Sequence, residues 1–314
     1  MPPTTSNSVA KFPPIATEES LLPPHLPPHL PPPVPPRTTY KLSFLGTPLP
    51  KAETPLTPEE TLIFFDWDDT CMASGWLQAN GFKTYDAYGP VLEKYAEMGE
   101  ALASVLEPLL LHASKLGRVV FVTNANEGWV QLSCAALMPK LLPLISSFSV
   151  FSAQDRYKHM TPSPMEWKRR TFQEVVMAIP GPIGKLRNFI SIGDGVAEKY
   201  AVHALRGNPS ALFYRPMNIV KAVKLLEQPT PSVLVEQLVA LHQMLESVVH
   251  HPSSTDILAE LTVTSVLPPL PDSRSDTEED VVITVADPGA VLAAALVSKI
   301  KEEEREFFLG LTEI

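Results

Sequence analysis

Short, unbroken apolar runs are the feature that most constrains how this chain can fold. Runs of four or five residues that do not alternate with polar positions are typical of strands buried on both faces of a parallel sheet. Longer segments with helical spacing separate them, at 90–115, Leu132–Leu144, Glu166–Ala178 and 232–249. Strands alternating with helices predict an α/β fold with a doubly wound parallel sheet. The expected strands are Thr61–Phe65, Val119–Val122, Phe148–Ser152, Phe189–Ile192 and Ala211–Tyr214.

The folded domain is expected to occupy only the middle of the 314-residue chain. Half of the 34 prolines lie before residue 60. Proline fixes φ and removes a backbone donor, so residues 1–58 are predicted to be a disordered, Pro-rich tail with polyproline II character. The catalytic domain is expected at 59–250. An acidic linker is predicted at 251–288 and a C-terminal helix at 289–314.

Composition narrows the classes of partner and the compartment. The formal net charge is −10 and no basic run is present, which argues against nucleic acid as a partner. No apolar stretch approaches the roughly 20 residues that span a bilayer, so no membrane segment is expected. Two cysteines, Cys71 and Cys134, do not imply a disulfide framework. A cytoplasmic protein is the expectation, and the sequence does not separate cytoplasm from nucleus.

One tail motif suggests a protein partner. Pro32, Pro35 and Arg37 match the PxxP pattern with a following basic residue that SH3 domains bind. The alternative is a stiff, disordered spacer, because such matches arise often by chance.

Acidic residues follow the first predicted strand directly. Asp66, Asp68 and Thr70 stand where an open α/β sheet places its ligands, outside the carboxyl ends of the strands. A polar turn is the alternative, and for this motif alone the two interpretations are balanced.

Further polar residues follow later strands. Thr123 and Asn124 follow the second strand, and could bind a phosphate oxygen or cap the next helix. Asp194 lies in a Gly-Asp-Gly turn after the fourth strand, with Glu198 one helical turn further on. These two could face the sheet edge or simply complement the helix dipole. Lys168 lies on the helix between, where a solvated lysine is the alternative.

In order, these motifs resemble the haloacid dehalogenase superfamily, specifically its phosphatase branch. The likeness covers residues 60–215 and consists of DxDxT, then Thr, then Lys, then GDxxxE. The WDDT stretch at 67–70, together with Thr123–Ala125, Gly128 and Trp129, also resembles a poorly characterised group of protist proteins within that superfamily.

The resemblance implies a Rossmann-like fold and a role for each matching residue. Asp66 would be the nucleophile that forms an aspartyl phosphate, and Asp68 the general acid and base. Mg²⁺ would be held by Asp66, Asp194 and the backbone carbonyl of Asp68. Phosphoryl and substrate contacts would come from Thr70, Thr123, Asn124 and Lys168.

Glu198 departs from the family pattern, which often has aspartate there, and would support the metal or the lysine. The presence of Asp68 favours a phosphatase (a phosphoric monoester hydrolase) over a dehalogenase, because it can protonate an alkoxide leaving group.

Segment lengths leave no room for a cap domain. About 20 residues follow Thr70 before the long helix, and the stretch from Thr123 to Lys168 is already used by predicted elements. An open site favours a phosphoprotein or another large substrate. Two alternatives remain: a non-catalytic scaffold that recruits partners through its tails, or a phosphotransferase.

Overall fold

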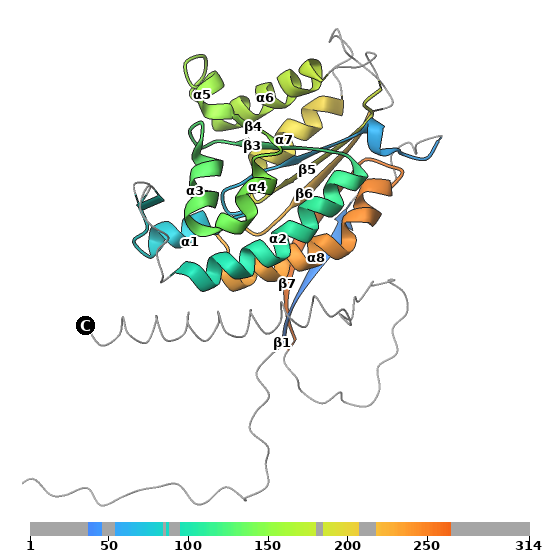
Figure 1. Cartoon of the computed structure of the whole chain (residues 1–314). Helices are drawn as coiled ribbons and strands as arrows, with labels where there is room; N and C mark the ends of the chain where they lie inside the picture. Colours follow the sequence, from blue (N-terminus) through green and yellow to red (C-terminus); the bar gives the residue numbers. More distant parts are fainter. Residues whose placement is uncertain are drawn as a thin grey trace, which may run out of the picture. The chain divides into compact units, whose positions relative to one another are not determined.

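A computed structural model describes residues 37–45, 54–83, 86–87, 95–179, 185–206 and 218–264. Their centre is a sheet in the order β1-β7-β6-β5-β2-β3-β4 (Figure 1). The six strands from β7 to β4 run parallel, and β1 pairs antiparallel with β7. The strands are β1 Arg37–Leu45, β2 Thr61–Phe65, β3 Arg118–Thr123, β4 Ser149–Ser152, β5 Asn188–Gly193, β6 Ile219–Lys224 and β7 Thr255–Thr264.

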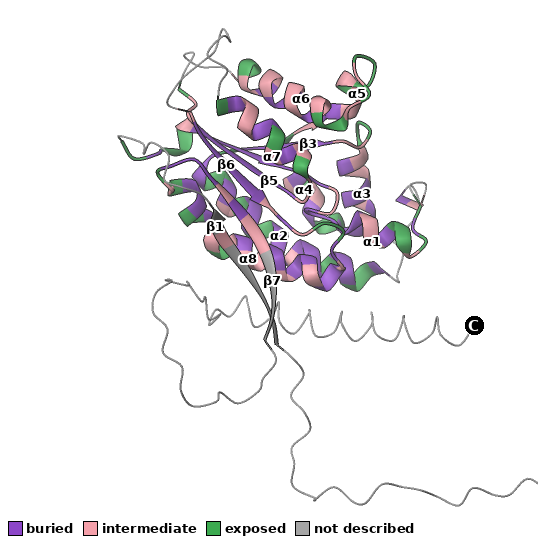
Figure 2. Ribbon diagram, turned by 180° about the vertical axis from the view of Figure 1, so that it is seen from behind, coloured by how far each residue is buried: buried purple, intermediate pink, exposed green. Residues whose placement is uncertain are grey.

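Helices cover both faces of the sheet, as the apolar strand sequences require. One face packs against α2 (Ala96–Leu116), α3 (Trp129–Leu137) and α8 (Pro231–His250). The other packs against α6 (Pro164–Ala178) and α7 (Val196–His203), where Phe64 of β2 stacks on Phe172 with ring centroids 3.9 Å apart. Figure 2 shows the central strands almost wholly buried between these layers. The shorter helices are α1 Ser74–Ala79, α4 Leu142–Ile145 and α5 Ala153–Tyr157.

The strand order places a topological switch beside β2. The chain runs outward from β2 to β3 and β4, then crosses back to β5 on the other side of β2. Open α/β sheets bind ligands at such a point, outside the carboxyl ends of the strands. The doubly wound parallel sheet predicted from the apolar runs is confirmed.

The predicted domain limits need correction at both ends. Arg37–Leu45, assigned to the disordered tail, forms β1. Thr255–Thr264, assigned to the acidic linker, forms β7, and the two strands pair over the full length of β1. Backbone hydrogen bonds between the two segments stabilise strands whose local composition does not predict them. The rest of the tail, the rest of the linker and the predicted C-terminal helix lie outside the described residues.

One predicted strand is not described by the structure, and one observed strand was not predicted. The expected strand Ala211–Tyr214 lies outside the described residues. On the side of β5 away from β2 lies β6, which was not predicted because Lys221 and Lys224 interrupt its apolar pattern. Within the described part of the chain, no helix has both the length and the apolar character needed to cross a membrane.

Candidate active site

The carboxyl end of β2 turns into a tight loop that points alternate residues in opposite directions. The amide of Asp66 still pairs with the Ile192 carbonyl at 2.9 Å, so this residue extends the strand. Trp67 is fully buried, and its indole donates to the Ser133 hydroxyl at 3.0 Å. Asp66 and Asp68, on either side of it, are thereby left for the sheet edge.

Lys168 lies between two carboxylates at the end of the sheet. Its Nζ is 2.7 Å from Oδ1 of Asp66 and forms a second ion pair with Glu198. The side chains of Lys168 and Asp66 are only 2% and 7% exposed, so this ion-pair group is buried. The sequence alone left Lys168 as an ordinary helical lysine or a site residue, and the structure brings it to Asp66.

Burial and neighbouring charges both shift the pKa values of these three side chains. Burial raises the pKa of Asp66 well above its usual range; the Lys168 ammonium opposes that shift and Glu198 reinforces it. Burial would lower the pKa of Lys168, but Asp66 and Glu198 outweigh it and the pKa lies above its usual range. Burial would raise the pKa of Glu198, but the charge of Lys168 outweighs it and the pKa lies below its usual value. Lys168 therefore stays protonated.

Asp68 is fixed by three side-chain donors. Its Oδ1 accepts hydrogen bonds from the Ser74 hydroxyl at 2.6 Å and from the Trp129 indole N–H at 2.9 Å. Its Oδ2 accepts one from the Thr123 hydroxyl at 3.1 Å. The ends of β2 and β3 are thus joined by a direct hydrogen bond between Thr123 and Asp68.

Thr70 links the β2 loop to the β5 loop. Its hydroxyl accepts a hydrogen bond from the Asp194 amide at 3.1 Å and donates to Oδ1 of Asp194 at 3.4 Å. Burial raises the pKa of Asp194 to about 6, with the Glu198 charge as the next cause. The Gly193 position is crowded by Glu198, since a Cβ there would lie 2.3 Å from Cγ of Glu198. Glycine therefore lets Glu198 reach back towards Lys168.

Asp69 turns the chain in the middle of the motif, a role that the DxDxT pattern leaves unassigned. Its φ of 55° lies in the left-handed region, and its Oδ1 accepts the Gly75 amide at 2.7 Å. The other carboxylate oxygen fills the space that a side chain at Gly75 would need. Asp69 and Gly75 together shape the loop that carries Asp66 and Asp68.

Excess negative charge makes the site suited to a divalent cation. Five carboxylates, from Asp66, Asp68, Asp69, Asp194 and Glu198, influence one another, and Lys168 supplies the one ammonium that pairs with them among the described residues. Oδ1 of Asp66 is buried with no well-directed hydrogen bond, despite its ion pair.

The donor set bears on which metal the site could take. In the described part of the chain, no three His, Cys, Asp or Glu side chains form a ready-made metal cage. Mg²⁺ needs no such cage, because it retains waters and uses one or two carboxylates. Asp66, Asp194 and the Asp68 carbonyl supply oxygen atoms, the ligand type that Mg²⁺ prefers.

Two site residues escaped the sequence-based prediction, and one predicted residue stands apart. Ser74 and Trp129 hold Asp68 but belong to no predicted motif position; Trp129 was noted only as part of a family likeness. The one sign of this role in the sequence is that each donor closely follows a motif residue: Ser74 follows Thr70, and Trp129 follows Thr123. For Asn124, the side-chain Oδ1 is buried and accepts no hydrogen bond from the described residues, so no hydrogen bond joins this oxygen to Lys168 or to the other site residues.

Comparisons with known proteins give no relative from which to argue. No family model, no curated protein and no solved structure matches this chain.

Proposed function

We propose that this chain is a Mg²⁺-dependent phosphomonoester hydrolase of the haloacid dehalogenase superfamily, acting through an aspartyl phosphate on Asp66. One observation carries the proposal. Asp66 contacts a buried lysine at 2.7 Å, and the neighbouring Asp68 is held by Thr123 at 3.1 Å, both at the carboxyl ends of parallel strands. Nucleophile, acid and phosphoryl-binding groups are thus within one loop cluster.

The site groups can divide the reaction into two displacements. A carboxylate oxygen of Asp66 attacks phosphorus, and the bond from phosphorus to the leaving oxygen breaks as protonated Asp68 gives that oxygen its proton. Ionised Asp68 then takes a proton from water, whose oxygen attacks phosphorus. The bond from phosphorus to Asp66 breaks, inorganic phosphate leaves, and both aspartates return to their starting states.

Positive charge is needed because a carboxylate and a phosphate dianion repel each other. Lys168 neutralises part of that charge and is held in place by Glu198. When bound, Mg²⁺ would supply the remainder as a Lewis acid, held by Asp66, Asp194 and the Asp68 carbonyl. Thr70 would support this arrangement by fixing Asp194 against the β2 loop.

A large substrate, such as a phosphoprotein, is the class that the segment lengths favour. Among the described residues, α1 is the only helix between Thr70 and α2, and the elements from α3 to α5 fill the stretch from Thr123 to α6. Neither stretch gives room for a cap domain. An uncovered site admits a phosphorylated side chain on a protein surface.

The test is hydrolysis of p-nitrophenyl phosphate by the full chain. Chelation by EDTA should abolish turnover, and added Mg²⁺ should restore it. Asp66→Asn, which preserves shape but removes the nucleophile, should lower kcat by roughly a thousandfold or more. The matched control is Asp256→Asn, whose carboxylate pairs with Lys199 and His203 instead of Lys168. Turnover by Asp66→Asn equal to that of the control would contradict the proposal.

A further inference from the structure

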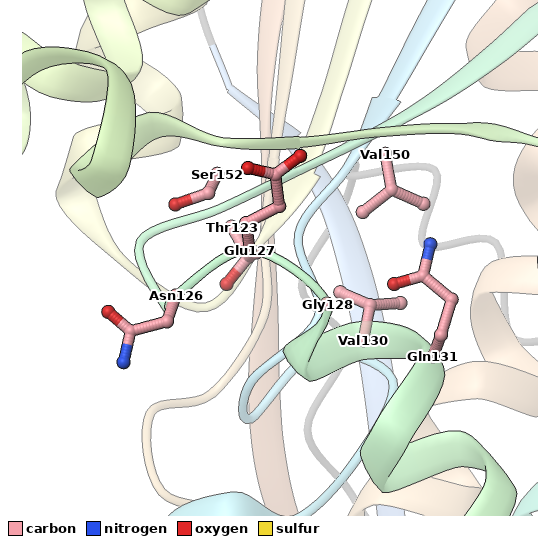
Figure 3. A pocket seen from close by; sticks show the side chains of 8 residues that line it. All are labelled: Thr123, Asn126, Glu127, Gly128, Val130, Gln131, Val150 and Ser152. Atoms are coloured by element: carbon pink, nitrogen blue, oxygen red, sulfur yellow. The ribbon is translucent and has the colours of Figure 1, made fainter.

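A cavity of about 310 Å³ lies beside Thr123, one of the residues of the proposed site (Figure 3). Thr123, which holds Asp68, also forms part of the cavity wall. The remaining wall comes from β4 and from the loop and first turn that lead into α3, including Glu127, Gln131 and Val150. If a phosphoryl group binds between Asp66 and Thr123, its leaving group can therefore enter this cavity.

Two side chains on this wall can accept a hydrogen bond from a ligand, the Gln131 amide and the Glu127 carboxylate, while the amides of Asn126 and Gln131 can also donate. Oε1 of Gln131 is buried and has no hydrogen-bond donor among the described residues. The exposed Glu127 side chain also lines the cavity, and among the described residues its carboxylate forms no hydrogen bond; the Glu127 backbone amide donates to the Asp155 carboxylate at 2.7 Å. Figure 3 shows both side chains at the cavity wall, with Gln131 beside Val150. A buried acceptor without a donor costs about 1–3 kcal/mol, which a ligand N–H can recover.

The hydroxyls on the wall cannot supply further donors to a ligand. Thr123 donates to Asp68, and Ser152 donates to the Ala125 carbonyl at 2.6 Å. No lysine or arginine is found among the described residues that line the cavity. A leaving group with a second phosphate or a carboxylate would meet Glu127 without a compensating cation.

We propose that this cavity is the leaving-group subsite and that it selects phosphomonoesters carrying an ammonium or guanidinium group close to the ester oxygen. The inference rests on the proposed function and narrows its substrate class. The cation would contact Glu127 and donate an N–H to Gln131, while Val130 and Val150 contact the carbon chain that bears it. Such a cation is found on a lysine or arginine beside a phosphoserine, and also on a small amino-alcohol phosphate.

The experiment compares three phosphoserine peptides that differ only in the residue after the phosphoserine: lysine, norleucine or glutamate. O-Phosphoethanolamine and n-propyl phosphate form the corresponding small-molecule pair, and p-nitrophenyl phosphate is the reference without a cation. The full chain should show kcat/KM in the order lysine, norleucine, glutamate. Glu127→Gln should reduce the preference for lysine over norleucine by about threefold to fivefold, the range for a partly solvated ion pair.

Matched variants distinguish an effect on the subsite from a general loss of folded or active protein. Gln131→Leu should also reduce the lysine preference, measured within each variant as the ratio of kcat/KM for the lysine and norleucine peptides, so that any common change in turnover cancels. Glu107→Gln, on the exposed side of α2, should leave the preference unchanged. A cation preference confined to the small pair would support the subsite and identify its substrate as an amino-alcohol phosphate.

Two failures are distinguishable. Normal p-nitrophenyl phosphate turnover with no preference for either cationic substrate overturns the subsite alone. Absence of p-nitrophenyl phosphate turnover in the unmodified chain overturns the proposed function and the subsite with it.

Discussion

Asp68 accepts hydrogen bonds from donors on three different elements. Ser74 follows it on α1, Thr123 ends β3, and Trp129 begins α3. Three donors fix the carboxylate in one orientation, which is what a group that must protonate one oxygen and then activate water requires. Ser74 and Trp129 are therefore positioning residues in the proposed reaction, because they act through Asp68.

Removing the indole donor tests that role. Trp129→Phe should lower kcat about tenfold on a phosphoserine peptide, with a smaller effect on KM, because the hydrogen bond holds the acid and not the substrate. The loss should be smaller on p-nitrophenyl phosphate, whose leaving oxygen needs little protonation. Steady-state kinetics on both substrates measures the difference.

The matched control for this substitution is Trp167→Phe. Trp167 also donates an indole hydrogen bond, but to the Thr161 carbonyl at 2.6 Å, away from Asp68. Equal losses in the two variants, or a loss that does not depend on the leaving group, would show that Trp129 serves only stability.

At the scale of single elements, β6 carries an unusual buried lysine. Lys221 is fully buried, and its ammonium donates to the Val249 carbonyl at 2.6 Å, near the end of α8. No carboxylate in the described part of the chain pairs with it, and burial lowers its pKa to about 7. The partial negative charge at the helix end only partly offsets this burial.

This lysine makes stability depend on pH. Its folded pKa of about 7 lies below the ordinary value of 10.5, so between these values the unfolded chain binds more protons than the folded one. The free energy of unfolding should therefore rise with pH across this window, by about 1.4 kcal/mol per pH unit at most from this group. Urea unfolding at pH 7, 8 and 9 measures the slope.

Lys221→Met removes this group, and the slope should become flatter by that amount. The comparison cancels the contribution of other titrating residues. An unchanged slope would mean that Lys221 remains protonated in the folded protein.

The same lysines explain why β6 could not be predicted. The sheet strands β2, β3 and β5 are apolar runs, and each was predicted from the sequence within one or two residues. β6 reads IVKAVK, and the burial of Lys221 depends on an acceptor from α8 that is 28 positions away. Local hydrophobicity contains no information about that acceptor.

At the scale of the whole molecule, strand pairing between distant parts of the chain limited what could be predicted from the sequence. Arg37–Leu45 and Thr255–Thr264 are more than 200 positions apart, and each gains its strand structure from partners distant in sequence. The contacts of Asp68 with Thr123 and of Thr70 with Asp194 follow from the sequence, because these residues come after apolar strands whose carboxyl ends lie at one edge of the sheet. Ser74, Trp129 and the turn at Asp69 became evident only from side-chain geometry.

Pairing of β1 with β7 can be tested by truncation. A variant lacking residues 2–45 should have a lower free energy of unfolding, by on the order of 2 kcal/mol, than one lacking only residues 2–36, because it loses β1 and exposes the edge of β7. Urea denaturation of the two variants measures this difference. Equal midpoints would show that β1 does not contribute to the folded domain.

The central claim is that Asp66 carries the phosphoryl group. The most direct test is to quench the full chain during turnover of a phosphoserine peptide, reduce it with borohydride and locate the product by mass spectrometry. Borohydride converts an aspartyl phosphate to homoserine, so homoserine should be found at position 66 and nowhere else. Sustained turnover with an unmodified Asp66, or with homoserine at another aspartate, would contradict this account.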